Sequence, residues 1–512
     1  MLREDDPAGM TALGHNYLSI GQMRIKNIFT KTVHIQLAPW FSVMYLILII
    51  SGCTAVGPNY VRPEISVYKD WNTRFNNDSK TNEMDLQLLA KWWTTINDAK
   101  LSELIERAIV GNLDLKQARA RVREARARRG SAKAGLFPTI NATSSATWNR
   151  PSADTTSSQT SDLYTAGFDA AWELDIFGGT RRSVEASQRD LQAKEEDMHN
   201  VIVSLLAEVA LNYLDVRIYQ TRLTVAEDNL ESQRQTYQLT QWQYKAGLSD
   251  ELSVQQARYN FENTRSQIPA LHTGLEAAMN RVAVLLGEQP GKVHAELKKR
   301  EPIPVPSLSV VVGVPADLLR RRPDVRQAEM ELAAQTARVG VAIADLYPKF
   351  TLSGSIGLDI LSSNNLSSNS LTLSSGPGIT WAIFKGGAIR QNIEIQSALQ
   401  EQALVNYEAV ILSALEEVEN ALVAYGDGEQ KSRSLREATQ AAQKAAELAQ
   451  YKYQAGLTDF SNVLDAQRSL LSFQDQLIQS NGNVTADLVR LYKTLGGGWT
   501  PFENGVITNR RG

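Results

Sequence analysis

Few residues of this 512-residue chain could carry out catalysis. The sequence has one cysteine, Cys53, and five histidines. The histidines in the body of the chain, His199, His272 and His294, lack the spacing of metal ligands. One cysteine excludes both a disulfide framework and a cysteine-based zinc site. No nucleophile–base set or phosphate-binding loop accompanies these residues. The sequence therefore predicts a protein that is not an enzyme and that needs no metal or cofactor.

The chemistry that Cys53 can do is lipid attachment. An apolar run at residues 40–50 is too short to span a bilayer as a helix and follows a basic segment, as in a secretory signal. Ser51 and Gly52 place small residues directly before the thiol, which resembles a bacterial lipobox. We expect residues 1–52 to be a leader, with Met23 as the true start, and Cys53 to be lipidated. The alternative is an incidental cysteine at the end of an ordinary signal.

Composition and charge exclude another class of function. The chain has 53 Lys and Arg against 56 Asp and Glu, a formal net charge of -3, so it lacks the excess positive charge of a strongly basic nucleic-acid binder. The arginine-rich run at 119–129 has the look of a nucleic-acid patch, but we interpret it as a solvated helix face. We expect no nucleic-acid partner.

Internal repetition organises the chain. Four pairs of matching segments occur in the same order, each about 210 residues apart. The matched segments are 114–118 with 324–328, 136–138 with 346–348, 176–179 with 383–387, and 244–250 with 453–459. The predicted regions are an N-terminal segment (53–97), repeat 1 (98–288), a proline-rich linker (289–314), repeat 2 (315–495) and a tail (496–512).

Each repeat predicts a helix, two strands, a very long helix and a last helix. In repeat 1 the helices are expected at 98–134, 180–246 and 250–286 and the strands at 138–150 and 164–177. In repeat 2 the helices are expected at 316–345, 388–455 and 459–495 and the strands at 348–360 and 371–384. The strands alternate apolar and polar residues and are long enough for tilted membrane strands. The alternative is a soluble sheet with one wet face.

Four strands cannot close a barrel, and open strand edges are not tolerated in lipid. A membrane barrel would therefore have to be shared between chains. Two chains would supply eight strands and three would supply twelve, and the strand pattern does not choose between them. Each long helix, at about 1.5 Å per residue, would extend roughly 100 Å.

Several short motifs carry a family resemblance. They are Cys53-x4-Pro58-x-Tyr60-x2-Pro63, Trp92-Trp93, Arg321-Arg322-Pro323-Asp324, Leu464-Asp465-Ala466-Gln467 and Leu495-Gly-Gly-Gly-Trp499. Together they resemble the outer-membrane efflux protein family (TolC-like), and in particular the lipoprotein outer-membrane subunits of resistance-nodulation-division pumps.

The resemblance implies a mainly α fold with a membrane β-barrel. It implies a homotrimer in which a 12-stranded barrel in the outer membrane continues into a periplasmic α-helical barrel. The trimer would work with a periplasmic adaptor and an inner-membrane pump. It would conduct drugs or other small toxic compounds passively from the periplasm to the exterior. Two alternatives are the exit duct of a protein-secretion system and a structural envelope lipoprotein without a pore.

The two turns that end the long helices are candidate docking sites. Their residues are Gly247, Leu248 and Ser249 in repeat 1 and Gly456, Leu457 and Thr458 in repeat 2. A glycine suits a chain reversal that needs positive φ. The resemblance implies that both turns form a periplasmic tip that docks on the adaptor. Alternatively, they are only helix caps.

The candidate gate lies about two turns beyond the second tip. The resemblance implies that Asp465 points inward and forms the narrowest ring of the resting channel. Ser461 occupies a position where related pumps often carry leucine, which predicts a more polar constriction. The equivalent of Asp465 in repeat 1 is Gln256, so the gate would differ between the repeats. The alternative is that Asp465 is simply an exposed helix charge.

Overall fold

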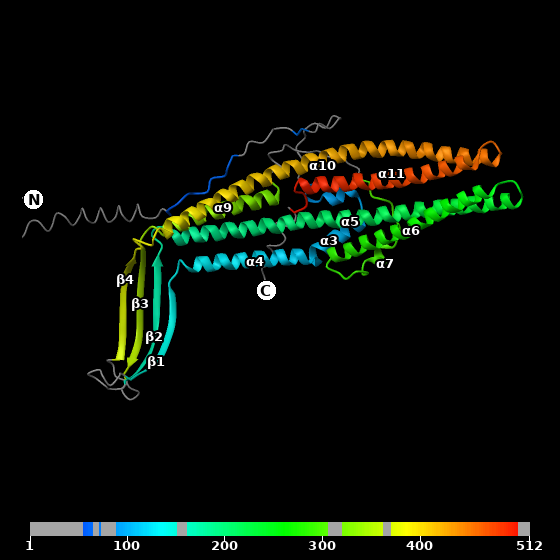
Figure 1. Ribbon diagram of the computed structural model, residues 1–512. Coiled ribbons are helices and arrows are strands. Elements are labelled where there is room, and N and C mark those ends of the chain that lie inside the picture. Colours follow the sequence, from blue (N-terminus) through cyan, green and yellow to red (C-terminus); the bar gives the residue numbers. More distant parts are fainter. Residues whose placement is uncertain are drawn as a thin grey trace, which may run out of the picture. The chain divides into compact units, whose positions relative to one another are not determined.

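The computed structural model describes residues 55–64, 71–72, 89–150, 161–305, 320–361 and 370–499 (Figure 1). These residues belong to one compact unit that begins at Ala55. The leader, Cys53 and part of the predicted linker lie outside the described residues. The helical elements of the first half are η1 (Trp92–Ile96), α3 (Ala99–Gly111), α4 (Leu113–Ala134), α5 (Gly179–Lys245), α6 (Glu251–Leu285) and α7 (His294–Leu297). Those of the second half are α9 (Pro323–Ala344), α10 (Ala388–Gln454) and α11 (Phe460–Thr494).

The tandem repeat and the mainly helical fold are confirmed by matching elements in the two halves. The long helices α5 and α10 both have 67 residues, and the helices that return from them, α6 and α11, both have 35. At 1.5 Å per residue the long helices extend roughly 100 Å. No described helix is both long and apolar enough to cross a membrane.

The predicted first helix of repeat 1, 98–134, is wrong in one respect because the structure breaks it at Asn112. The backbone of Asn112 leaves the helical region, with φ -56° and ψ 134°. Its side-chain oxygen accepts from the Leu115 amide at 2.9 Å, and its side-chain nitrogen donates to the Leu285 carbonyl at 2.9 Å. An asparagine that satisfies the first turn of the following helix competes with helix continuation. Two helices, α3 and α4, result.

Three other elements have boundaries that differ from the prediction by three residues or more. Helix α9 starts at Pro323 rather than 316, because proline lacks an amide hydrogen and favours the first helical position. Strand β2 (Ser161–Leu174) both begins and ends three residues earlier than predicted. Asp175 then accepts from the amides of Thr180 and Arg181 at the start of α5. Strand β4 (Leu371–Thr380) also ends before residue 384.

The four strands form one antiparallel sheet in the order β1-β2-β3-β4, where β1 is Thr139–Asn149 and β3 is Lys349–Ile360. The register aligns the alternating patterns. Phe168 lies opposite Ala142 on one side and Ile356 on the other, and Ile356 lies opposite Leu373. Apolar residues of all four strands therefore share one face, on which Phe168, Ile356 and Leu373 are 58%, 48% and 76% exposed.

The opposite face of the sheet is polar and is tied together by side chains. Thr143 donates to Asp169 at 3.0 Å, and the hydroxyls of Ser145 and Thr165 lie 2.8 Å apart. Ser355 and Ser374 form a similar pair at 3.0 Å. A sheet with one exposed apolar face and one hydrogen-bonded polar face suits a boundary between lipid and water.

The helices follow the same lateral order as the strands. Near the sheet, α4 packs on α5, α5 on α9, and α9 on α10. Farther away, α6 packs on α5, α5 on α11, and α11 on α10 (Figure 1). Each layer thus begins with an element of repeat 1 and ends with one of repeat 2. The main core lies where η1, α3, α5, α6 and α11 meet, and Trp92 stacks on Tyr492 there with ring centroids 5.7 Å apart.

Candidate functional site

Both long helices end in the same hydrogen-bonded turn. Gly247 has φ +69° and Gly456 has φ +72°. The Leu248 amide donates to the Gln243 carbonyl, and the Leu457 amide donates to the Lys452 carbonyl, both at 2.8 Å. Each glycine amide donates to the residue three before it, which completes a Schellman motif. The leucine that follows each glycine is left 80% and 75% exposed at the two tips.

The helices that leave the two turns start differently. In repeat 1 the Asp250 carboxylate accepts from the Ser253 amide at 2.8 Å. Hydrogen bonds from the Ser253 side chain and from this amide keep the pKa of Asp250 below its ordinary value. In repeat 2 the Asp459 side chain makes no capping bond. The Asn462 side chain instead donates to the Thr458 hydroxyl at 2.8 Å. Ser249 and Thr458 therefore lie in turns of similar backbone but different side-chain support.

Each tip also carries an exposed aromatic residue that sequence reasoning missed. Trp242 and Tyr451 both lie five residues before the turn glycine and are 64% and 69% exposed. They are equivalent positions of the two repeats. Comparing the repeats position by position up to the glycine, instead of stopping at the turn, would have found them. Together with Leu248 and Leu457 they add apolar surface near both turns.

Ser461 and Asp465 lie on the same exposed side of α11, one turn apart. The Asp465 side chain is 73% exposed, and its carboxylate lies 3.5 Å from the guanidinium of Arg468. Arg468 donates to the Asn260 side-chain oxygen at 3.2 Å and to the Tyr259 hydroxyl, and its guanidinium lies 5.1 Å from the Tyr259 ring centre. The arginine next to the candidate gate thus connects α11 to α6 of the other repeat.

Polar bonds continue along this joint between the two hairpins. Arg222 on α5 donates twice to Asp475 on α11, at 2.6 and 3.2 Å. Two side-chain hydrogen bonds also join α5 to α11. Asn229 donates to Gln474 at 2.8 Å, and Gln467 donates to the Thr236 hydroxyl at 3.2 Å. The joint thus combines these polar bonds, which water can replace, with a small apolar cluster in which Ala257 of α6 packs with Phe460, Val463 and Leu464 of α11.

A cleft of about 680 Å³ lies between α5, α6 and α11 beside these bonds. Asn260 and Gln233 on its wall are both 3% exposed. The Asn260 Nδ2 and Gln233 Oε1 atoms have no hydrogen-bond partner among the described residues. Buried polar groups in a roomy polar cleft take water as their partner. The cleft is thus a wet seam between the hairpins.

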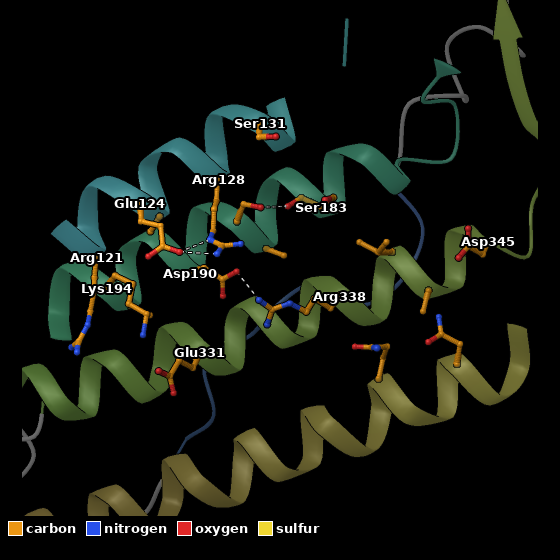
Figure 2. A pocket seen from close by; sticks show the side chains of 18 residues that line it. Arg121, Glu124, Arg128, Ser131, Ser183, Asp190, Lys194, Glu331, Arg338 and Asp345 are labelled. Carbon is orange, nitrogen blue, oxygen red and sulfur yellow. Dashed lines mark hydrogen bonds and ion pairs between the residues drawn. The ribbon is translucent and has the colours of Figure 1, made fainter. Parts of the chain in front are cut away.

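A second cleft, of about 880 Å³, lies between α4, α5, α9 and α10 (Figure 2). Its charged side chains alternate in sign. Arg338 on α9 donates to Asp190 on α5 at 2.6 Å, and Arg128 donates to Glu124 within α4 at 2.7 Å (Figure 2). Arg121 lies 3.7 Å from Asp197 of α5. The charges match one another within the chain, so this cleft has the character of a hydrated helical wall.

The fold and these features define a class of protein. Two similar helical hairpins, far longer than a globular domain, continue from a sheet with one exposed apolar face. This arrangement is expected of a chain that forms one segment of the wall of a conduit.

Comparison with known proteins gives the family. The model of the outer membrane efflux protein family matches residues 104–288 and 314–497, one segment in each repeat. The chain belongs to this family. It is 32% identical to nodulation protein T of Rhizobium leguminosarum bv. trifolii, over 90% of this chain and 97% of that protein. It is 31% identical to the cation efflux system protein CusC of Escherichia coli O6:H1, over 88% of this chain and 97% of that protein.

The solved structure of the outer-membrane channel OprN is similar throughout. It covers 87% of this chain and 100% of the OprN chain, with a TM-score of 0.81 and 36% identity. The protein is therefore an outer-membrane efflux channel with a long periplasmic helical portion, and not an enzyme.

Proposed function

We propose that this chain forms the trimeric exit duct of a tripartite efflux pump. The duct passively conducts drugs or other small toxic compounds from the periplasm to the exterior. The observation that carries the proposal concerns the long helices and strands that the structure describes. In each layer the two outermost elements, one from each repeat, have no further long helix or strand beside them: β1 and β4, then α4 and α10, then α6 and α10. Repetition of one chain around an axis joins the edge of repeat 1 to the edge of repeat 2.

Three copies fit the sheet better than two. Strands β1 and β4 each have one side without a strand partner among the described residues, and lipid does not tolerate such edges. Eight strands would leave an interior filled by side chains, whereas twelve leave room for a channel. The polar face of the sheet would then line that channel and the apolar face would meet lipid. A lipid on Cys53 would anchor the same chain at the membrane.

We propose Asp465 as the gate of the closed duct, with Ser461 one turn closer to the tip. Their exposed side of α11 is free to face a central axis. Three carboxylates at a constriction would favour cations and repel one another, so contacts elsewhere must hold them together. The bonds of Arg468 and of the Arg222–Asp475 pair support this, since they attach α11 to the other hairpin.

The two tips are the proposed docking sites of a periplasmic adaptor. Through this adaptor an inner-membrane pump would deliver compounds into the duct. The exposed Leu248 and Leu457 support this proposal, as do the neighbouring aromatics Trp242 and Tyr451. The positive φ of Gly247 and Gly456 holds the same turn at both tips. A trimer would thus present six similar turns to the adaptor. Ser249 and Thr458, beside the two leucines, distinguish the two kinds of turn.

Single-channel conductance in a planar bilayer tests the duct and its gate together. We expect the wild-type protein to be nearly closed. Asp465→Asn should conduct more, with a weaker preference for cations, because the charged ring is removed. Gln256→Asn, at the equivalent position of repeat 1, is the control and should leave both properties unchanged.

The alternatives give other results. Absence of conductance in verified, natively inserted protein and in Asp465→Asn contradicts the duct and favours a structural envelope lipoprotein. A wild-type channel that is already wide open contradicts the gate assignment. Co-purification with an adaptor of a protein-secretion system, and not of an efflux pump, contradicts the proposed cargo.

A further inference from the structure

Helix α4 carries a concentration of positive charge that the duct itself does not require. Its 22 residues include eight Lys or Arg and only two acidic residues. Four of the arginines are engaged within the chain: Arg119 by the Ile109 carbonyl, Arg121 by Asp197, Arg126 by Glu195 and Arg128 by Glu124. Lys116 and Arg123 are exposed and have no ion pair or side-chain hydrogen bond with any described residue.

The opposite edge of the same helical layer is acidic. Over the first half of α10, from Ala388 to Asn420, there are six glutamates and a single basic residue, Arg390. Three of the glutamates, Glu394, Glu401 and Glu408, are exposed and likewise have no partner among the described residues. Figure 1 shows α4 and α10 on opposite sides of α5 and α9, so the two rows cannot meet within one chain.

The two rows have the same spacing. Lys116 and Arg123 are seven residues apart, as are successive members of the Glu394, Glu401 and Glu408 row. Seven residues make nearly two helical turns, so each row runs straight along its helix. Rows of opposite charge that flank a contact at this spacing are the arrangement by which coiled coils select partners.

The rows also lie at the same height in the wall. Arg121 contacts Asp197 on α5, and Asp190, two turns nearer the sheet, contacts Arg338 on α9. Gln335, one turn from Arg338, donates to the Gln396 side chain of α10 at 2.8 Å. Following these contacts from helix to helix places Arg121 at about the height of Glu401. The basic row, on either side of Arg121, therefore covers the same stretch of wall as the acidic row.

The rows fall on the same side of a contact between neighbouring copies. Helix α4 runs toward the sheet, because β1 follows it, and α10 runs away from the sheet, because β4 precedes it. Successive residues are rotated by 100° around a helix axis. Seen along each helix from its first residue, the basic row of α4 and the acidic row of α10 are both displaced from the most exposed line of the helix in the same rotational direction. The opposite directions of the two helices then bring both rows to one side of the seam when the edges meet.

We propose that Lys116 and Arg123 of one copy form ion pairs with the row Glu394, Glu401 and Glu408 of the next copy. This charged seam fixes the register of the helical wall. The inference rests on the proposed trimer and names the contact that aligns it. Between the rows, exposed Val405 and Leu412 of α10, 58% and 66% exposed, would pack against the small exposed crest of Ala120 and Ala127.

Charge reversal in the full-length protein in detergent tests the seam by native mass spectrometry. Glu401→Lys with Glu408→Lys should raise the dissociation constant of the trimer roughly tenfold or more, because like charges then oppose each other at every seam. Lys116→Glu with Arg123→Glu should do the same. Combining all four substitutions should restore the trimer to near the wild-type level. Raising the salt concentration should weaken the wild-type trimer and strengthen both reversed variants.

The matched control is Arg121→Glu with Arg128→Glu, which makes the same charge change on the other side of α4. Unlike Lys116→Glu with Arg123→Glu, this control should not rescue the trimer that Glu401→Lys with Glu408→Lys has weakened. Rescue of both combinations, or of neither, overturns the seam, as does a reversal that leaves the trimer intact but prevents adaptor binding. Helix content by circular dichroism must match the wild type, since all the changed residues are exposed. A wild-type chain that forms no trimer refutes the proposed assembly instead.

Discussion

The two long hairpins of this channel have the same design and opposite positions. The hairpin of α5 and α6 and that of α10 and α11 have equal helix lengths and the same turn at the tip. Yet α5 has helices on both flanks throughout, whereas α10 is always at an edge. Among the described helices, the long helix of repeat 1 is therefore a central spine, and the long helix of repeat 2 lies at the edge, where the proposed trimer would place a neighbouring chain.

The chemistry of the returning helices follows the same division. Where repeat 2 has Asp465 and Arg468, repeat 1 has Gln256 and Tyr259. Asp465 is largely exposed and Arg468 lines the wet cleft, while the Tyr259 hydroxyl accepts from Arg468. The difference teaches that, if α11 carries the proposed gate, the hairpin of repeat 1 supplies the contacts that support it.

The largest expected difference between the hairpins is in stability. Leu206 on α5 is fully buried in the main core, and its equivalent on α10, Leu415, is only partly buried. Leu206→Ala should cost about 2–5 kcal/mol, because it removes apolar contacts and leaves a cavity. Leu415→Ala should cost clearly less. Thermal unfolding in detergent, followed by circular dichroism, measures both. Equal losses would contradict the division into spine and edge.

The second expected difference is in gating. Arg468→Ala removes the bonds from α11 to Asn260 and Tyr259. Hydrogen bonds to a partly exposed charge are worth about 1–2 kcal/mol, and 1.4 kcal/mol is a factor of ten in an equilibrium. The open fraction should therefore rise on the order of tenfold in single-channel recordings.

The control for this prediction lies in the other hairpin. Arg258 on α6 is exposed and has no ion pair or side-chain hydrogen bond with any described residue. Arg258→Ala removes the same side chain at nearly the equivalent position and should leave the open fraction unchanged. If both variants open the channel alike, the effect is one of surface charge and not of the joint.

Much of the fold could be predicted because each sequence pattern that indicates an element occurs in both repeats. The Ala-Gly-Leu turns and the alternating strands appear in both repeats, and their spacing gives the element order. The break at Asn112 could not be predicted from periodicity, since an asparagine is tolerated in a helix until its side chain finds better partners. Here those partners are the Leu115 amide and the Leu285 carbonyl, and the second is far away in sequence.

The candidate site was predicted less completely. The turns and Asp465 stand out by residue type, but their roles depend on contacts between chains. Arg468 and Arg222 did not stand out, because arginines on long polar helices are common and usually solvated. Only the packing of α11 on α5 and α6 shows that these two have partners in the other hairpin.

The smallest expected difference concerns the start of the returning helices. The pKa of Asp250 is lowered because hydrogen bonds from the Ser253 side chain and from the Ser253 amide favour the ionised carboxylate. A carboxyl with a lowered pKa in the folded protein stabilises the fold above its unfolded pKa of about 3.9 and loses this effect as the pH falls through the folded value. Since the Asp459 side chain makes no capping bond, the first turn of α11 should lack this dependence.

Hydrogen exchange of the first-turn amides measures this dependence. Protection factors at residues 251–254 should fall as the pH is lowered from about 5 to about 2, whereas those at 460–463 should change little. Asp250→Ala should abolish the pH dependence in repeat 1, and Asp459→Ala should have no matching effect in repeat 2. A similar pH dependence in both repeats would mean that Asp459 also caps its helix in the assembled channel. The tips would then be equivalent, and the asymmetry of the gate would have to arise wholly from residues 461–475.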